Sequence, residues 1–206
     1  MGKTVLLLTA SPLGPASVSQ RMADACAETV GEIYPAATLI RRDLSAIPFP
    51  AMDREAVNYL DGRETALDAE TTALMDDLCQ EFMAADIYVF ALPHWNLCVP
   101  PAVLSYSLCT MRAGKAFKYT EAGPVGLLQN KQALILLASG GDCDTDNPIM
   151  HCYGVDWLKG ILGLCGVKKV DVVYAQGMEG RPEAAEDIVR QALWDTRAFV
   201  KKARWL

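Results

Sequence analysis

The chain has 206 residues, of which 51% are hydrophobic and 21% are charged, and its formal net charge is −6. This composition excludes an intrinsically disordered chain, and the length allows one domain with a substantial core or at most two small ones. Because an acidic protein lacks the basic face that neutralises phosphates, we expect no nucleic-acid partner.

Apolar runs and turn residues divide the chain into five buried strands that alternate with helices. The expected strands are 4–10, 37–44, 86–93, 131–138 and 168–175. The expected helices are 17–34, 65–84, 100–112, 153–165 and 182–203. Between them we expect an irregular segment and a loop with room for short strands, at 45–63 and 114–130. The alternation predicts an α/β sandwich of three layers, with a parallel five-stranded sheet between helices, in a single domain that spans 1–206.

Residues 87–111 contain no Asp, Glu, Lys or Arg, and this window is long enough to span a bilayer. Pro93, Pro100, Pro101 and Asn96 interrupt it, and lipid could not satisfy the polar groups that they leave unpaired. The apolar stretch near the N-terminus is too short for a signal peptide and lacks a cleavage site. We therefore expect a cytoplasmic protein with no membrane segment, in which the window forms a buried strand, a tight loop and a buried helix.

The chain has seven cysteines, an odd number, and no two of them form a C-x-x-C pair. This pattern favours free thiols in a reducing compartment over a disulfide framework, and most are expected to be small buried hydrophobes. Cys143, His151 and Cys152 could be considered as metal ligands, but their spacing matches no standard zinc pattern. We expect no metal site.

Ligands of parallel α/β sheets bind beyond the carboxyl ends of the strands, and a hydroxyl-rich loop follows the first strand here. It contains Ser11, Ser17, Val18 and Ser19 and matches neither a dinucleotide-binding glycine pattern nor a P-loop. The segment from Ser17 to Gln20 forms a Ser-x-x-Gln capping box, so the loop can be a plain helix cap. Alternatively, the N–H groups and dipole of the helix start bind a phosphate, and the serine hydroxyls supply further neutral donors.

Two more loops are expected at the same edge. A stiff, uncharged, aromatic loop follows the third strand and contains Pro93, His94, Trp95, Asn96 and Leu97. Trp95 and Asn96 in such a loop suit a planar heterocycle, although Trp95 alone could be a core plug and His94 a satisfied loop histidine. The loop after the fourth strand contains Ala138, Ser139, Gly140 and Gly141, where paired glycines let backbone N–H groups approach a ligand closely.

Together these loops resemble those of the FMN-dependent NADH-azoreductase and quinone-reductase family, which has a flavodoxin-like fold. The resemblance extends from Thr4 to the C-terminal helix, and its most specific motifs are the loop from Pro93 to Pro100 and the run from Arg112 to Leu127. It implies that Ser11 and Ser17 to Ser19 hold the FMN phosphate. It also implies that Pro93 to Leu97 line the isoalloxazine, that Ala138 to Gly141 contact its pyrimidine side, and that Tyr119 and Leu164 belong to the substrate site.

The resemblance further implies an enzyme in which NADH or NADPH reduces FMN by hydride transfer and a quinone or azo compound then takes up two electrons, in a ping-pong reaction. The flavin carries this chemistry, so no side chain need be an obligate catalytic group. Homodimers with the flavin site at the subunit interface are also implied.

This chain departs from the family pattern at four positions outside the flavin loops. Leu104 and Leu108 stand where a lysine and an aspartate are frequent, and Ile161 and Leu164 stand where aromatic residues are frequent. We expect these changes to bear on acceptor specificity and on the dimer contact.

Two other functions remain open. A non-enzymatic flavodoxin-like electron carrier is less favoured, because carriers are usually shorter and more acidic. A serine hydrolase acting on a phosphopantetheine ester ranks lowest, because neither His94 nor His151 has an evident partner motif.

Overall fold

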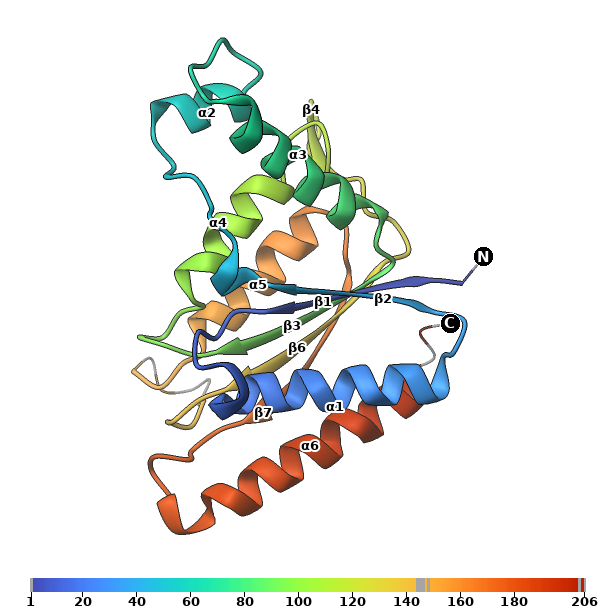
Figure 1. Ribbon diagram of the computed structural model, residues 1–206, viewed down its shortest axis with the longest axis vertical. Helices are drawn as coiled ribbons and strands as arrows, with labels where there is room; N and C mark the ends of the chain where they lie inside the picture. The colour runs from blue at the N-terminus through green and yellow to red at the C-terminus, as the bar shows by residue number, and fades with distance from the viewer. Residues whose placement is uncertain (1, 144–146, 148, 204, 206) are drawn as a thin grey trace.

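The computed structural model describes residues 2–143, 147, 149–203 and 205 (Figure 1). Five parallel strands form one sheet in the order β2-β1-β3-β6-β7. The strands are β1 (Thr4–Thr9), β2 (Thr38–Asp43), β3 (Ile87–Pro93), β6 (Gln132–Ala138) and β7 (Lys169–Ala175). This order is the doubly wound one, in which the direction of winding reverses between β1 and β3.

Helices cover both faces of the sheet (Figure 1). One face carries α1 (Val18–Ile33) and α6 (Ala185–Lys202). The other carries α3 (Ala69–Ala84), α4 (Pro101–Thr110) and α5 (Tyr153–Leu164). The predicted three-layer α/β sandwich is therefore confirmed, and its strands match the five predicted ones to within one or two residues at each end.

The two apolar layers explain why the strands read as continuous apolar runs. Leu6 and Leu8 of β1 point into the core beneath α3, α4 and α5, whereas Val5 and Leu7 point into the core beneath α1 and α6. Every residue of β3 is buried, since this strand lies in the centre of the sheet. The first part of the uncharged window is thus a strand covered on both faces, as the sequence predicts.

The segment 45–63 is not wholly irregular, and this expectation was wrong. It contains α2 (Arg54–Leu60), whose N-cap residue Asp53 accepts hydrogen bonds from the backbone N–H groups of Glu55 and Ala56 at 3.0 Å. The prolines at 48 and 50 conceal this short helix in the sequence, and it lies far from the sheet (Figure 1). The described residues also form three 3₁₀ turns at helix or strand ends, η1 (Gly14–Ala16), η2 (Leu44–Ala46) and η3 (Pro182–Ala184).

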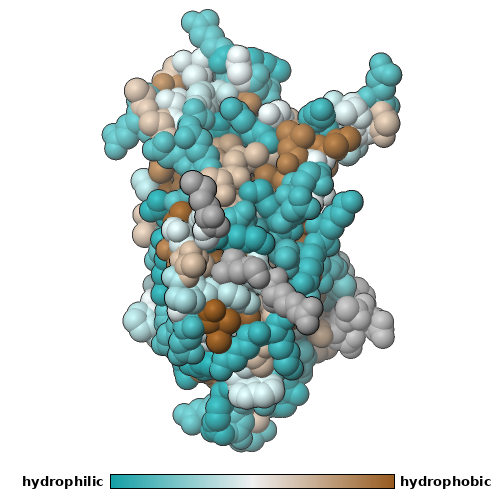
Figure 2. Space-filling model, turned by 90° about the vertical axis from the view of Figure 1, so that its right-hand side faces the viewer, coloured by the Kyte–Doolittle hydropathy of each residue, from teal (hydrophilic) through white to brown (hydrophobic). Residues whose placement is uncertain are grey.

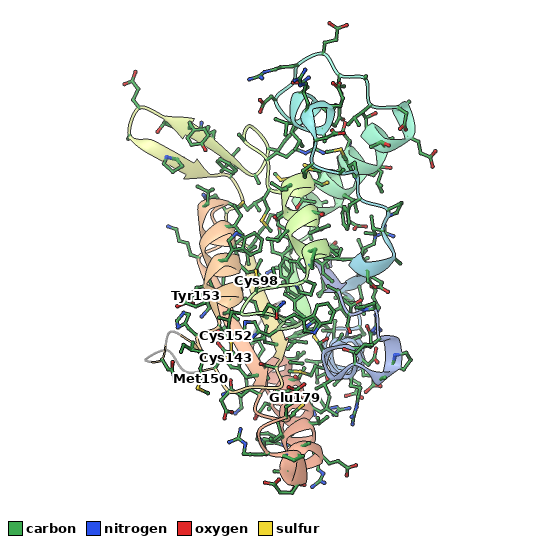
Figure 3. All side chains as sticks on the ribbon, turned by 90° about the vertical axis from the view of Figure 1, so that its left-hand side faces the viewer. Cys98, Cys143, Met150, Cys152, Tyr153 and Glu179 are labelled. Atoms are coloured by element: carbon green, nitrogen blue, oxygen red, sulfur yellow. A yellow bond between two sulfur atoms is a disulfide. The ribbon has the colours of Figure 1, made fainter. Side chains whose placement is uncertain are left out.

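The expected loop at 114–130 forms a two-stranded hairpin, β4 (Phe117–Thr120) and β5 (Gly123–Gly126), that projects from the body of the protein. Figure 2 views the face opposite to that in Figure 3, and hydrophobic side chains gather there beside the projecting arm on an otherwise mostly hydrophilic surface. The exposed apolar residues of this region include Tyr119, Val125 and Leu127. None of the helices in the described part of the chain is long and apolar enough to cross a membrane.

Candidate active site

A cavity of about 770 Å³ lies beyond the carboxyl ends of β1, β3 and β6. This volume is in the range of small-molecule and cofactor sites, and the position is the switch point of the sheet. Every residue predicted from the sequence to bind the cofactor lines this cavity except Ser19, namely Ser11, Ser17, Val18, Pro93, His94, Trp95, Asn96, Leu97, Ala138, Ser139, Gly140 and Gly141. The three predicted loops therefore do converge on one site.

The cavity also contains residues that the sequence analysis missed: Leu13, Ala16, Asp142, Ile149, Met150, Met178 and Glu179. Met178 and Glu179 follow β7, so the rule that ligands bind at carboxyl ends of strands could have found them. Ile149 and Met150 lie far along the connection from β6 to α5, and their position at the cavity depends on tertiary folding. No motif in the sequence marks them.

The start of α1 forms one end of the cavity. Ser17 is its N-cap residue, and the Ser17 hydroxyl accepts a hydrogen bond from the N–H of Gln20 at 3.5 Å. Only this half of the predicted capping box forms, because the Gln20 side chain donates to Asp24 and the Ser17 N–H donates to the carbonyl of Gly14. The first N–H groups of the helix have no acceptor within it, and Ser17 and Val18 at its start line this end of the cavity.

Ser19 is fully buried behind the cavity surface, so it does not line the site as predicted. Its hydroxyl lies 3.0 Å from that of Ser17. Ser19 therefore orients the Ser17 side chain in the described structure.

The loop after β3 is a tight two-residue turn. Trp95 and Cys98 exchange backbone hydrogen bonds of 3.1 and 2.9 Å, and the two residues between them, Asn96 and Leu97, both have positive φ angles, 48° and 64°. A positive φ is uncommon for leucine, and such backbone strain is concentrated at functional sites. The N–H of His94 donates to the carbonyl of Ala138, which joins this loop to the loop after β6.

His94 is a partly buried side chain of the cavity wall. Burial lowers the pKa of its imidazole below the usual value, which favours the neutral form. Its Nε2 atom is buried and has no hydrogen-bond partner among the described residues. An orphaned buried polar atom of this kind fits a site that receives a polar ligand.

The loops after β6 and β7 hold each other through backbone hydrogen bonds. The N–H of Glu179 donates to the carbonyl of Gly140 at 2.8 Å, and the N–H of Gly177 donates to the carbonyl of Gly141 at 3.0 Å. A Cβ on Gly141 would meet no atom within 4 Å, so this glycine presents bare backbone to open space. Such a backbone can bring its polar groups close to a ligand.

The electrostatics of the cavity are unusual for a site that would take an anion. Its ionisable lining groups, apart from His94, are the carboxylates of Asp142 and Glu179, and the described lining includes no lysine or arginine. Arg181 pairs with Asp142 at 2.5 Å and offsets that one charge. The end formed by α1 is consequently the part of the cavity whose dipole favours a negative group.

The pattern of cysteines favours free thiols over a disulfide framework, and two of the seven cysteines depart from this expectation. Cys143 and Cys152 form a disulfide with a Cα–Cα distance of 5.4 Å. The sequence could not show this pairing, because it is the fold that brings the loop after β6 against the start of α5. Five cysteines are free, and burial raises the pKa of the Cys26 and Cys165 thiols to about 12, as expected of inert hydrophobic residues.

The imidazole nearest to this pair belongs to His94 rather than to His151, the histidine that the sequence analysis considered. The Nε2 atom of His151 instead lies 2.5 Å from the Asp156 carboxylate.

The two residues assigned to the substrate site, Tyr119 and Leu164, do not line the cavity. Tyr119 lies on the projecting hairpin and is 73% exposed, whereas Leu164 is at the end of α5 and packs against the core. A role for either residue stays a prediction that a single chain does not test.

Comparison with known proteins agrees with this fold. Residues 3–200 match a family model described as flavodoxin-like fold, so the chain belongs to this family. It is 34% identical over 194 residues to an FMN-dependent NADH:quinone oxidoreductase of Beijerinckia indica subsp. indica, with 92% of this chain and 95% of the relative covered. It is 37% identical over 185 residues to a protein of the same name from Yersinia pestis, with 88% and 90% covered.

A solved structure of the azoreductase AzrA superposes on the chain with a TM-score of 0.86 and 29% identity. The match covers 97% of this chain and 99% of that one. The similarity therefore extends over nearly the whole chain.

The start of α5 supports the loop after β3, which yields a prediction for Gly154. Its N–H donates to the carbonyl of Leu97 at 3.1 Å, and an added Cβ would lie 2.7 Å from the backbone nitrogen of Val99. We expect Gly154→Ala to displace this loop and to lower the free energy of unfolding by about 1–3 kcal/mol in urea denaturation. The control is Gly160→Ala in the same helix, where a Cβ meets nothing within 4 Å and stability should rise by up to about 1 kcal/mol. Equal effects of the two substitutions would contradict the proposed packing.

Proposed function

We propose that the cavity is an FMN site and that the chain is an FMN-dependent NADH:quinone oxidoreductase that also accepts azo compounds. The observation that carries this proposal is the joining, in one cavity, of a helix N-terminus, an uncharged aromatic loop and a glycine loop. The names of the relatives and of the azoreductase structure support it, since these proteins match the chain over nearly its full length.

The phosphate of FMN would lie at the start of α1. Ser17 and Ser11 offer hydroxyl donors there, and the first N–H groups of the helix add a dipole that favours an anion. The two carboxylates of the cavity follow β6 and β7 and do not belong to α1. This arrangement would bind the phosphate without a basic side chain from the cavity lining.

The flavin ring would lie between the turn at 94–97 and the glycine loop. Trp95 and Leu97 supply apolar surface, and Asn96 supplies both a hydrogen-bond donor and an acceptor. The backbone N–H groups of the segment from Ser139 to Gly141 would face the pyrimidine side and favour the added negative charge of the reduced ring. FMN, when bound, supplies the transfer of two electrons from NADH to the acceptor, and the protein holds and orients it.

A second copy of the chain would complete the substrate site. Leu108 of α4 is 47% exposed, Leu104 is partly exposed, and the hairpin displays Tyr119 and Val125 to solvent. These apolar side chains at the edge of the molecule are of the kind that a homodimer buries. In such a dimer Tyr119 could reach the site of the partner chain, which would account for its distance from the cavity of its own chain. The net charge of −6 does not favour a nucleic-acid partner.

The function is tested by absorption spectroscopy and turnover. The purified protein, reconstituted with FMN, should show flavin absorption that NADH bleaches and a quinone restores, with continuous NADH oxidation in the presence of both. NADPH in place of NADH establishes the preference between the two donors. A flavin that NADH cannot reduce would favour the electron carrier, and failure to bind FMN at all would refute the cofactor site.

The phosphate position is tested by substitution of the N-cap residue. Both aspartate and asparagine cap helices as well as serine does, so Ser17→Asp and Ser17→Asn should both fold. Only the aspartate adds a charge beside the phosphate, and it should raise the dissociation constant for FMN at least about tenfold, measured by quenching of flavin fluorescence. An unchanged dissociation constant for Ser17→Asp would show that the placement of the phosphate is wrong.

A further inference from the structure

The Cys143–Cys152 disulfide lies directly behind the wall of the proposed FMN cavity. Cys143 follows the glycine loop after β6, and Cys152 is the N-cap residue of α5 (Figure 3). The Sγ atom of Cys152 lies 4.0 Å from Nδ1 of His94, which lines the cavity. The sulfur pair is therefore separated from the cavity by one side chain.

The disulfide links the segment after β6 to the start of α5, which supports the loop after β3. On one side, the N–H of Cys143 donates to the Gln176 side chain at 3.1 Å, which ties this cysteine to the loop after β7. On the other side, Gly154, two residues beyond Cys152, packs against the backbone of Cys98 and Val99 in the loop after β3. Opening the bond would remove the covalent link between the loop that contains Gly140 and Gly141 and the start of α5, which supports the turn at 94–97.

Several features distinguish this bond from a purely structural disulfide. Its cysteines are only nine residues apart, so it constrains the unfolded chain less than a long-range bond would. The other five cysteines are free, which shows that the chain is not built on a disulfide framework. Cys143 is partly exposed whereas Cys152 is 7% exposed, so Cys143 is the more accessible residue of the pair.

We propose that Cys143 and Cys152 form a reversible thiol–disulfide site, exchanging with small-molecule thiols, whose oxidation state sets the affinity of the neighbouring cavity for its cofactor. The second part of this inference rests on the proposed FMN site. The exchange itself is independent of it.

The chemistry is ordinary thiol–disulfide exchange. A thiolate of the small molecule attacks the partly exposed Cys143 sulfur, the bond to Cys152 breaks, and the electron pair leaves with the Cys152 sulfur. The His94 imidazole beside that sulfur is placed to hydrogen-bond the leaving thiolate. A second small-molecule thiolate then attacks the mixed disulfide, which releases Cys143 and yields the oxidised small molecule. Two protons from solvent complete the two protein thiols, and the reverse steps restore the bond.

The reduced pair has one competing interpretation. One imidazole and two sulfur atoms within 4.8 Å of one another, from His94, Cys143 and Cys152, are also a ligand set that Zn²⁺ accepts. The bond between the two sulfur atoms favours the disulfide, because bonded sulfurs are not thiolate ligands. Zinc binding is therefore an outcome to be tested against the exchange.

The test follows thiols and cofactor affinity in the same samples. The protein is equilibrated in buffers of graded reduced-to-oxidised glutathione ratio, denatured, alkylated and weighed by mass spectrometry. The number of alkylated cysteines should fall from seven to five in a single transition as the buffer becomes more oxidising. Cys98→Ser, which removes a partly exposed free thiol nearby, should preserve that transition, whereas Cys143→Ser with Cys152→Ser should abolish it.

The dissociation constant for FMN should rise about threefold to tenfold along the same transition, because the reduced cavity loses preorganisation. The double serine variant should bind FMN as the reduced protein does at every ratio. A constant thiol count would overturn the exchange, as would uptake of one Zn²⁺ by the reduced protein that blocks oxidation. A changing thiol count with an unchanged dissociation constant would overturn the proposal that the oxidation state of the pair sets the affinity for FMN. Absence of FMN binding at every ratio would instead contradict the proposed function, while the thiol count still tests the exchange.

Discussion

The parallel arrangement of the central strands is the constraint on which the site depends. Because β1, β3, β6 and β7 all end at one edge, the loops that follow them meet there, and the helix after β1 directs its N-terminus into the same space. The positive end of that helix, rather than a lysine or arginine, is then the feature of the cavity that favours an anion. An acidic chain can in this way hold an anionic cofactor.

The uncharged window at 87–111 follows from the same constraint. Its strand occupies the centre of the sheet, where both faces are covered, and its turn forms a wall of the cavity. The helix that ends the window buries Val103 and Tyr106 in the core but leaves Leu108 exposed. Three different features along this stretch therefore account for the absence of charge: burial in the sheet, the proposed contact with the flavin ring, and the proposed contact with a second chain.

The parts of the structure that could be predicted from the sequence are those encoded locally. Apolar runs such as Val5 to Leu8 mark strands buried on both faces, and the residues that follow such runs must lie at one edge of the sheet. The features that escaped prediction depend on distant contacts. Ile149 and Met150 reach the cavity only through the path of a long connection, and Cys143 meets Cys152 only because α5 packs beside the glycine loop. Ser19 shows a subtler limit, since a pattern can place a hydroxyl beside a site without showing whether it faces the ligand or a neighbouring serine.

The central claim is that the start of α1 binds the cofactor by its phosphate, and comparison of FMN with riboflavin tests it most directly. The two ligands share the ring and the ribityl chain and differ only in the phosphate, so the ratio of their dissociation constants isolates the contribution of that group. Calorimetric titration of the apoprotein should show FMN binding at least about tenfold more tightly than riboflavin, the effect expected of a helix N-terminus and serine hydroxyls together. Equal affinities for the two ligands would contradict the account.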